Sequence, residues 1–148
     1  MADVKDVAQY ILKQRGGMTT WKLQKLVYYC QAWSLVWDDE SLFDDHIEAW
    51  ANGPVVRKLY DIHVGQFSIS KIKGGDSSRL NDTQRETVEA VLKTYSDKSP
   101  HWLSNLTHSE APWRDTRRLA GLSAGERGSA VIPLDAMAEY YGGLGAKG

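Results

Sequence analysis

Apolar residues recur at helical spacing near the start of the chain and predict two consecutive helices. Over residues 4–12 they follow the i, i+3, i+4, i+7, i+8 pattern of an amphipathic helix. The Gly16–Gly17 pair ends this helix, because glycine accepts the positive φ that a helix C-cap needs. Thr19 is then the predicted N-cap of a second helix, since its hydroxyl can accept a hydrogen bond from the first turn.

The second predicted helix, residues 20–37, is apolar on most of its sides. One face is formed by Leu23, Leu26, Val27, Cys30, Trp33 and Trp37, and the other sides carry Tyr28, Tyr29, Leu35 and Val36. A helix that is apolar on most of its surface is buried on most of its surface. We therefore expect residues 20–37 to form the central helix of the fold.

The middle of the chain predicts a small β element. Residues 42–50 alternate apolar and polar side chains toward their end, which is typical of a strand. A turn signal, Asn52-Gly53-Pro54, follows, and Pro54 is well placed to open a helix, where its missing N–H costs nothing. Residues 67–70 predict a second short strand, for which the first strand is a candidate partner although a helix separates the two.

A Gly- and Ser-rich loop, residues 73–78, leads into the next predicted helix. Thr83 and Glu86 match a capping box, in which each side chain satisfies a backbone N–H of the other's turn. Asn81 or Asp82 is an alternative N-cap for the same helix, since both residue types are favoured there.

Prolines and a second loop place the remaining elements. Pro100 opens one short helix and Pro112 opens another. Residues 121–130 form a Gly/Ser loop, and apolar residues at helical spacing predict a last helix over about 134–141. The glycine-rich tail from about residue 142 is expected to fray, as chain termini commonly do.

The chain as a whole predicts one compact domain. Its 148 residues suit a single domain with a substantial core, and no internal repeat or linker divides it. Hydrophobic residues make up 42% and charged residues 25%, which is ordinary for a globular protein. We predict a mainly α (α+β) fold across residues 1–148: a helical bundle around a central buried helix, with a small β element.

Net charge and targeting signals limit the cellular locations and partners that we expect. The formal net charge is −1, which gives the molecule no overall electrostatic reason to bind nucleic acid or an anionic membrane. The N-terminus lacks the pattern of a secretory signal, and no apolar run approaches the roughly 18 residues of a membrane span. We therefore expect a cytoplasmic protein. The lone cysteine, Cys30, is expected to be a small core residue.

The stretch THSEAPW, residues 107–113, contains an H-x-E motif that is compatible with zinc chemistry. A zinc deaminase combines this motif with two cysteines in P-C-x-x-C, whereas this chain has only Cys30, which lies upstream. A zincin needs two histidines four residues apart on a helix, whereas His101 and His108 are seven apart. The ligand count therefore argues against a zinc enzyme.

A helix boundary explains the same stretch without catalysis. Thr107 or Ser109 then caps a helix start, and Glu110 lies where the helix dipole favours an anion. The following Pro-Trp pair fixes the turn, with His108 packed or hydrogen-bonded beside the Trp ring. We favour this structural interpretation of the stretch.

Two further charged clusters are candidate binding sites. The acidic cluster within residues 44–48 suits a hard cation, yet such a cluster is more often a solvated strand edge. Basic residues flank the Gly16–Gly17 unit and suggest a helix-turn-helix, although the second helix is too apolar to lie in a DNA groove. No nucleotide-binding or nucleophile motif is present in the sequence. We assign no catalytic, cofactor-binding or metal-binding residue and expect a protein that is not an enzyme.

Three sequence blocks, in this order, resemble one known family. They are MTTWKLQKLVYYCQAWSLVW, LFDDHIEAWANGPVVRKLYD and LSNLTHSEAPW, between residues 18 and 113. Within them, KLQKLVYY, EAW-x-NGPV and LTH-x-E-x-PW resemble the Panacea domain of SocA-like proteins, long known only as a domain of unknown function. Residues 131–141 also fit this pattern, so the resemblance covers nearly the whole chain.

The resemblance implies the antitoxin of a type II toxin–antitoxin system. Members of the family are typically encoded beside a toxin gene in bacteria and phages, and they neutralise the toxin protein by direct contact. The partner toxins are diverse, and no catalytic residue comes with the family. A variant is an adaptor that delivers the toxin to a protease. The alternative is a DNA-binding regulator or phage accessory protein that uses the N-terminal helix–turn–helix-like unit.

Aromatic and charged residues in the family-like blocks are the candidate toxin contacts. The chain has six tryptophans and seven tyrosines, and such rings anchor interfaces because they bury a large area with few torsions. The candidates are Trp50, Arg57, His108, Glu110, Trp113 and Arg114, which periodicity does not force inward. The alternative is that these motif residues hold the fold while the variable surface meets the toxin.

Overall fold

The protein is described by a computed structural model that covers residues 2–145. The helices are α1 (Val4–Arg15), α2 (Thr20–Trp37), α3 (Arg57–His63), α4 (Asp82–Tyr95), α5 (Pro100–Ser109), α6 (Ala111–Leu119) and α7 (Leu134–Gly145), with a 3₁₀ turn at Ser77–Arg79. The strands are β1 (Met18–Thr19), β2 (Ile47–Trp50), β3 (Gly53–Val56) and β4 (Ser68–Ile69). The fold is mainly α with a small β element, as the sequence predicted.

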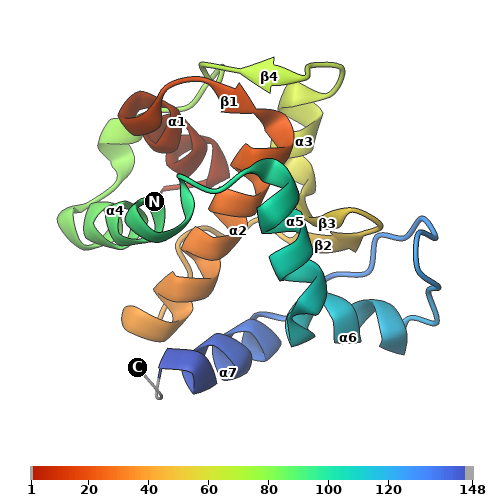
Figure 1. Ribbon diagram of the computed structural model, residues 1–148. Helices are drawn as coiled ribbons and strands as arrows, with labels where there is room; N and C mark the ends of the chain where they lie inside the picture. The colour runs from red at the N-terminus through yellow and green to blue at the C-terminus, as the bar shows by residue number, and fades with distance from the viewer. Residues whose placement is uncertain (1, 146–148) are drawn as a thin grey trace.

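Helix α2 is the centre of the fold, as its apolar sequence predicted. It is buried along most of its length and contacts α1, α4, α5 and α7, which surround it in Figure 1. The predicted N-cap is confirmed, because the Thr19 hydroxyl accepts a hydrogen bond from the backbone N–H of Lys22. This burial also leaves α2 without the exposed face that a DNA-reading helix needs. Among the described residues, no helix combines the length and apolar character needed to cross a membrane.

The β element differs from the prediction, because Pro54 lies in a strand and opens no helix. Strand β2 begins at Ile47 and forms an antiparallel hairpin with β3, which pairs Ala49 with Pro54. All four residues of β3 are buried, so the apolar run after Pro54 serves a covered strand, and α3 begins only at Arg57. The turn requires glycine at Gly53, whose φ is +131°.

A second small sheet joins the predicted 67–70 strand to Met18–Thr19, which was not predicted to be a strand. Strand β4 pairs with β1, which places Met18 opposite Ile69 and Thr19 opposite Ser68. The predicted pairing of the 67–70 segment with the first strand is therefore wrong. Two-residue strands are too short for side-chain alternation to reveal them in a sequence.

The helix ends in the second half also correct two predictions. The N-cap of α4 is Asn81, whose side chain accepts from the Gln84 N–H at 2.8 Å while Gln84 Oε1 accepts from the Asn81 N–H at 2.9 Å. The alternative N-cap Asn81 is therefore confirmed, and the capping box predicted at Thr83 and Glu86 is wrong. Helix α7 continues through Gly145, so residues 142–145 are helical although fraying was predicted there. Residues 146–148 lie outside the described chain.

Two buried glutamines of α2 hold β3 and the segment before β2 against the central helix. The Gln24 side chain accepts from the Val56 N–H at 2.9 Å and donates to the Val56 carbonyl at 3.2 Å, so it clamps β3 onto α2. The Gln31 side chain accepts from the Leu42 N–H at 2.7 Å and donates to the Phe43 carbonyl at 2.8 Å. Each amide thus satisfies buried backbone groups that no strand partner reaches.

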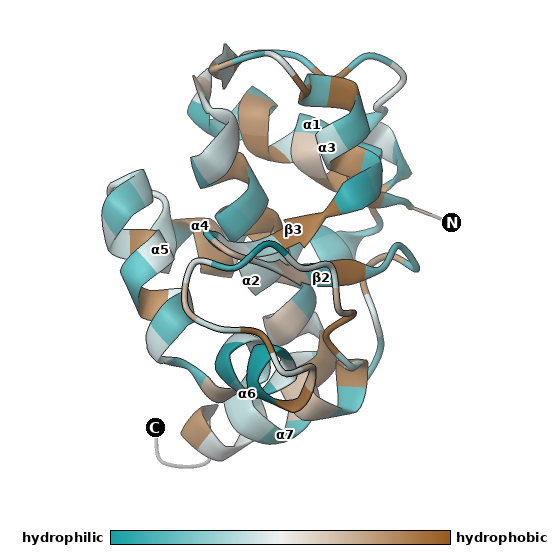
Figure 2. Ribbon diagram, turned by 90° about the vertical axis from the view of Figure 1, so that its right-hand side faces the viewer, coloured by the Kyte–Doolittle hydropathy of each residue, from teal (hydrophilic) through white to brown (hydrophobic). Residues whose placement is uncertain are grey.

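The long segment between α6 and α7 lies along the outer edge of the hairpin. In Figure 2 it crosses in front of β2 and β3. Ala49 donates its N–H to the Ala130 carbonyl, and Ile132 donates its N–H to the Ile47 carbonyl, both at 2.8 Å. These bonds cover the edge of β2, which otherwise would present unpaired backbone groups.

Candidate functional site

The six candidate residues lie on two neighbouring parts of the fold. Trp50 ends β2 and Arg57 begins α3, so both flank the hairpin. The other four lie at the junction of α5 and α6, where the stretch THSEAPW crosses from one helix to the next. A hydrogen bond from Trp113 Nε1 to the Trp50 carbonyl, at 2.8 Å, joins the two parts.

Trp50 and Arg57 share one carboxylate on the hairpin. Glu48 Oε1 accepts from Trp50 Nε1 at 2.8 Å and from Arg57 Nη2 at 3.0 Å, and Arg57 Nε lies 3.1 Å from both carboxylate oxygens. The guanidinium also lies over the indole ring, 5.3 Å from its centroid. Although burial acts to raise the pKa of Glu48, the hydrogen bonds from Arg57 and Trp50 hold it below its ordinary value.

His108 packs against Trp113, which confirms the predicted contact beside the ring. The two rings are stacked, with centroids 4.0 Å apart and an interplanar angle of 1°. Burial lowers the pKa of His108, and the nearby charges of Lys25 and Arg117 lower it further against the effect of the Asn52 carbonyl. Nε2 of His108 is buried and has no hydrogen-bond partner among the described residues.

Glu110 is turned inward and does not lie at an exposed helix start. It is the residue between α5 and α6, and its side chain caps neither helix. Its Oε1 accepts hydrogen bonds from the hydroxyl of Tyr29 at 2.7 Å and of Tyr141 at 2.8 Å. Burial raises the pKa of Glu110, while the two hydrogen bonds act in the opposite direction. The residue is 5% exposed, and its Oε1 is already engaged by the two tyrosine hydroxyls.

The predicted caps at Thr107 and Ser109 are also wrong. Both residues belong to α5, and their hydroxyls donate back to the carbonyls of Ser104 and Leu106. Only Glu110, which has an extended backbone conformation, separates α5 from α6. No further residue is left between the helices to provide a side-chain cap. Arg114, by contrast, is exposed on α6, where its guanidinium donates to the Ser109 carbonyl at 3.3 Å.

A buried arginine, whose burial was not predicted, holds the loop beside the site. Arg117 donates to the carbonyls of Ala49 at 3.0 Å, of Ser123 at 3.0 Å and of Glu126. Its guanidinium also lies 5.4 Å from the Trp113 ring centroid. Arg117 follows Trp113 by one helical turn, and this i, i+4 spacing is the only sequence signal that the two share a face.

Lys25 is the second buried cation that sequence reasoning missed. The residue is 1% exposed, and its Nζ lies over the Trp21 ring, 5.1 Å from the centroid. Burial lowers the pKa of Lys25 to about 8, and no neighbouring carboxylate raises it. A side chain at Gly53 would meet it, since a Cβ there would lie 2.8 Å from Nζ.

An open pocket lies beside the hairpin turn, and we call it the hairpin pocket. Its volume is about 640 Å³. It is lined by Trp21, Trp50, Ala51, Asn52, Arg57, Tyr60, Arg127, Gly128 and Ser129. The rings of Trp50 and Tyr60 meet edge to face, with centroids 4.7 Å apart. Aromatic and arginine side chains from α2, the hairpin, α3 and the 121–130 loop therefore converge on one surface.

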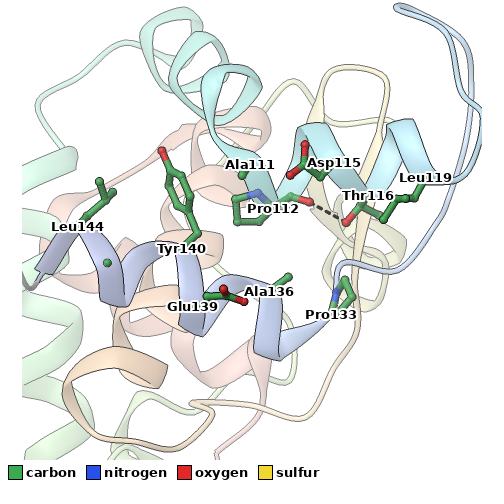
Figure 3. Close-up of a pocket in the computed structure, with 11 residues that line it drawn as sticks. Ala111, Pro112, Asp115, Thr116, Leu119, Pro133, Ala136, Glu139, Tyr140 and Leu144 are labelled. Atoms are coloured by element: carbon green, nitrogen blue, oxygen red, sulfur yellow. Dashed lines mark hydrogen bonds between the residues drawn. The ribbon is translucent and has the colours of Figure 1, made fainter.

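A second depression, the α6–α7 groove, is more apolar. It has a volume of about 540 Å³, and Figure 3 shows side chains of both helices lining it. Leu119 and Leu144 at its ends are 84% and 41% exposed, and Tyr140 forms part of its floor. Large exposed apolar side chains of this kind are common at protein-binding surfaces.

The geometry favours binding over catalysis at the H-x-E motif. Glu110 Oε1 is occupied by two tyrosine hydroxyls, and His108 is stacked face to face on an indole. Within residues 2–145, no three His, Cys, Asp or Glu side chains are grouped as a metal site requires. Of the six candidate residues, Trp50 and Arg57 line the hairpin pocket, and Arg114 is exposed on the neighbouring helix.

Comparison with known proteins identifies the sequence pattern. Residues 23–114 match the family model described as "Antitoxin SocA-like, Panacea domain". No curated protein and no solved structure matches the chain. The matched region runs from α2 to the start of α6, so it contains the hairpin, Lys25, Glu110 and Trp113.

Proposed function

The chain belongs to the family of SocA-like antitoxins with a Panacea domain, and from this premise we propose that it neutralises a toxin protein by direct contact through the hairpin pocket. The observation that carries the choice of surface is the convergence of Trp21, Trp50, Arg57 and Tyr60 on one accessible pocket. Tryptophan, tyrosine and arginine are the residues most enriched among interface hot spots.

The hairpin pocket is held rigidly, which favours tight binding. Trp50 is fixed through its Nε1 by Glu48, and its carbonyl is fixed by Trp113. The strand that follows is clamped by Gln24 of the central helix. Side chains that are already ordered lose little conformational entropy when a partner binds.

Five of the six candidates divide into two groups under this proposal. His108, Glu110 and Trp113 support the surface from within, because their side chains pack or hydrogen-bond inside the domain. Trp50 and Arg57 form the contact surface. Arg114 belongs to neither group, since it is exposed on α6 and does not line the pocket. Under this proposal, some of the candidate residues contact the toxin and others hold the fold.

The affinity required is that of a specific inhibitor. Neutralising a toxin in the cell calls for nanomolar binding or tighter, which corresponds to about −12 kcal/mol. Standard interfaces of that kind bury roughly 800 Å² on each partner. The hairpin pocket would form the centre of such a patch, with the surrounding polar surface as its rim.

Co-expression with the product of the adjacent reading frame tests the proposal. We expect that product to arrest growth alone, this protein to restore growth, and the two to copurify in a stoichiometric complex. Trp50→Ala should weaken the complex about 30-fold, as for a hot spot of about 2 kcal/mol. Trp102→Ala is the matched control, because Trp102 is 44% exposed on α5 and lies outside the pocket. A harmless neighbour, or equal losses in both variants, would overturn the proposal.

A further inference from the structure

We propose that the hairpin pocket is an anion site, which takes the carboxylate of an acidic side chain of the toxin, with Lys25 and Arg127 as its counter-charges. This inference rests on the proposed function and adds the chemistry of the group that the partner inserts. It assigns a binding role to Lys25, a buried residue that the sequence reasoning did not single out.

The first observation is that the Lys25 ammonium has no compensating partner. The residue is 1% exposed, and burial alone accounts for its lowered pKa, with no contribution from a carboxylate or a hydrogen bond. The contact that Nζ makes is with the face of the Trp21 ring. Isolated buried charges are strongly unfavourable, so a bound anion would relieve a cost that the free protein bears.

The second observation is where this ammonium lies. Trp21, whose ring covers Nζ, also lines the hairpin pocket. On the other side, Nζ lies 2.8 Å from the position of a Cβ at Gly53, next to the pocket residue Asn52. The ammonium is therefore held between a pocket wall and the turn, directly behind the accessible surface.

The third observation is the balance of charge around the pocket. Arg57 is already bonded to Glu48, whereas Arg127 lines the pocket without an ion pair to any residue in the 2–145 range. Lys25 and Arg127 together thus leave positive charge that the described side chains do not offset. A negatively charged group would match this surplus, and a side-chain carboxylate is the anion that a protein partner supplies.

The walls of the pocket strengthen such an interaction. Trp21, Trp50 and Tyr60 line the pocket, so their rings would lie against a bound carboxylate and displace part of its water. Charge pairs in a desolvated setting are stronger than exposed pairs, which contribute little. An aspartate or glutamate at the centre of the toxin's surface would therefore be an anchor and not a rim contact.

Removing the Lys25 charge tests the site in the complex. Lys25→Met keeps an unbranched apolar side chain and removes the ammonium, and we expect it to weaken toxin binding at least 30-fold while leaving the free domain as stable as before or more stable. Arg127→Gln should weaken binding about 10-fold and flatten its salt dependence. The controls are Lys22→Met on the same helix and Arg118→Gln on α6, which should stay within threefold of the parent.

The two readouts separate a binding role from a structural one. A lysine that merely supports the fold would, on substitution, lower both stability and binding. Unchanged toxin binding by Lys25→Met would overturn the anion site while leaving the antitoxin function intact. Loss of binding together with loss of stability would overturn it as well.

A second experiment needs no toxin and so distinguishes failure of the anion site from failure of the proposed function. The probes are N-acetylglutamate N-methylamide, its glutamine analogue and inorganic phosphate. Their binding is monitored through the NMR signals of the Lys25 and Arg127 side chains. We expect saturable millimolar binding of the glutamate probe, at least tenfold weaker binding of the glutamine probe, and loss of both in Lys25→Met. Absence of glutamate binding, or phosphate binding ten times more tightly than glutamate, would overturn the assignment.

Discussion

Glu110 and Lys25 are buried charged side chains beside the same central helix, and their surroundings differ. Glu110 is 5% exposed and accepts hydrogen bonds from the hydroxyls of Tyr29 and Tyr141. Lys25 is 1% exposed and faces an aromatic ring, with no carboxylate to balance its charge. The carboxylate of Glu110 is therefore stabilised by hydrogen-bond donors, whereas the ammonium of Lys25 contacts the face of the Trp21 ring.

The difference separates a structural charge from a functional one. The two hydroxyls that serve Glu110 come from α2 and α7, so the carboxylate ties the last helix to the central one. Among the described residues, Lys25 joins no elements through side-chain hydrogen bonds. The hairpin turn nevertheless has a glycine, Gly53, where it passes closest to the Lys25 side chain. A fold that leaves a buried cation unbalanced next to an accessible pocket has the property expected of a binding site.

Glu110→Ala should cause the largest effect on stability. It leaves two buried tyrosine hydroxyls without their acceptor and opens a cavity between α2 and α7, which together cost about 3 kcal/mol. Chemical denaturation at neutral pH measures the loss. Glu110→Gln is the matched control, because its carbonyl oxygen can accept both bonds that Oε1 accepts in the parent protein.

The pH dependence of Glu110→Gln tests the same contrast. Because burial raises the folded-state pKa of Glu110, the folded protein holds the proton more tightly than the unfolded chain. The parent therefore loses stability as pH rises from the unfolded-state pKa of Glu110 to its higher folded-state pKa, and the glutamine variant does not. We expect the variant to gain on the parent as pH increases from below 4 to 7. A gain in the opposite direction would mean that the tyrosines stabilise the ionised form.

Lys25→Met should stabilise the free protein, in contrast to Glu110→Ala. The pKa of Lys25 falls from 10.5 to about 8 on folding, a difference that corresponds to roughly 3 kcal/mol against the folded state below pH 8. Loss of the contact with the Trp21 ring offsets about 1 kcal/mol of this. The expected net gain is about 2 kcal/mol at pH 7, measured by denaturation.

The sign of this effect has a defined pH window. Since the folded-state pKa is the lower one, the parent protein becomes more stable as pH rises from 8 to 10.5, and the advantage of the variant then disappears. Lys22→Met, on the partly exposed side of the same helix, should show no such trend. A destabilised Lys25→Met at pH 7 would indicate a compensating partner for the ammonium.

The sequence predicted the framework of the site better than its chemistry. Helix α2 could be predicted because a helix that is apolar on most of its sides must be largely buried. The predicted helix boundary placed His108 beside the Trp113 ring, where the structure stacks the two. The hairpin could not, because a buried strand and a helix face both read as a short apolar run after Pro54. Proline at a helix start is common enough to favour the wrong alternative.

The buried charges escaped prediction for a different reason. Lysine and arginine are almost never fully buried, so Lys25 and Arg117 would be placed on solvent-facing sides by any rule of composition. What buries them is tertiary: the hairpin turn closes over Lys25, and three loop and strand carbonyls receive Arg117. The same holds for Glu110, whose donors lie 81 and 31 residues away in the sequence.

A smaller effect is expected from removing one donor to Glu110. Tyr141→Phe deletes a hydroxyl that donates to Glu110 at 2.8 Å and contacts the Tyr28 hydroxyl at 3.0 Å. The ring stays in place, so the loss should be about 1.5 kcal/mol in denaturation experiments. Tyr140→Phe, one residue earlier and only partly buried, should change stability by less than about 0.5 kcal/mol. Equal effects at both positions would show that Glu110 does not depend on its tyrosines.

The smallest effect tests whether the ring over Lys25 is its only partner. A second lysine–tryptophan pair with the same separation lies at the start of α5. Lys98, which precedes this helix, has its Nζ 5.1 Å from the Trp102 ring centroid, as Lys25 Nζ is from that of Trp21. Double-mutant cycles with Trp→Leu and Lys→Met should give a coupling of about 1 kcal/mol or more for the buried pair and about 0.5 kcal/mol for the other. Burial strengthens a cation–π contact only when no other group solvates the ammonium. Equal couplings would therefore mean that water or an acceptor reaches Lys25, and its charge would no longer require an anion from a partner.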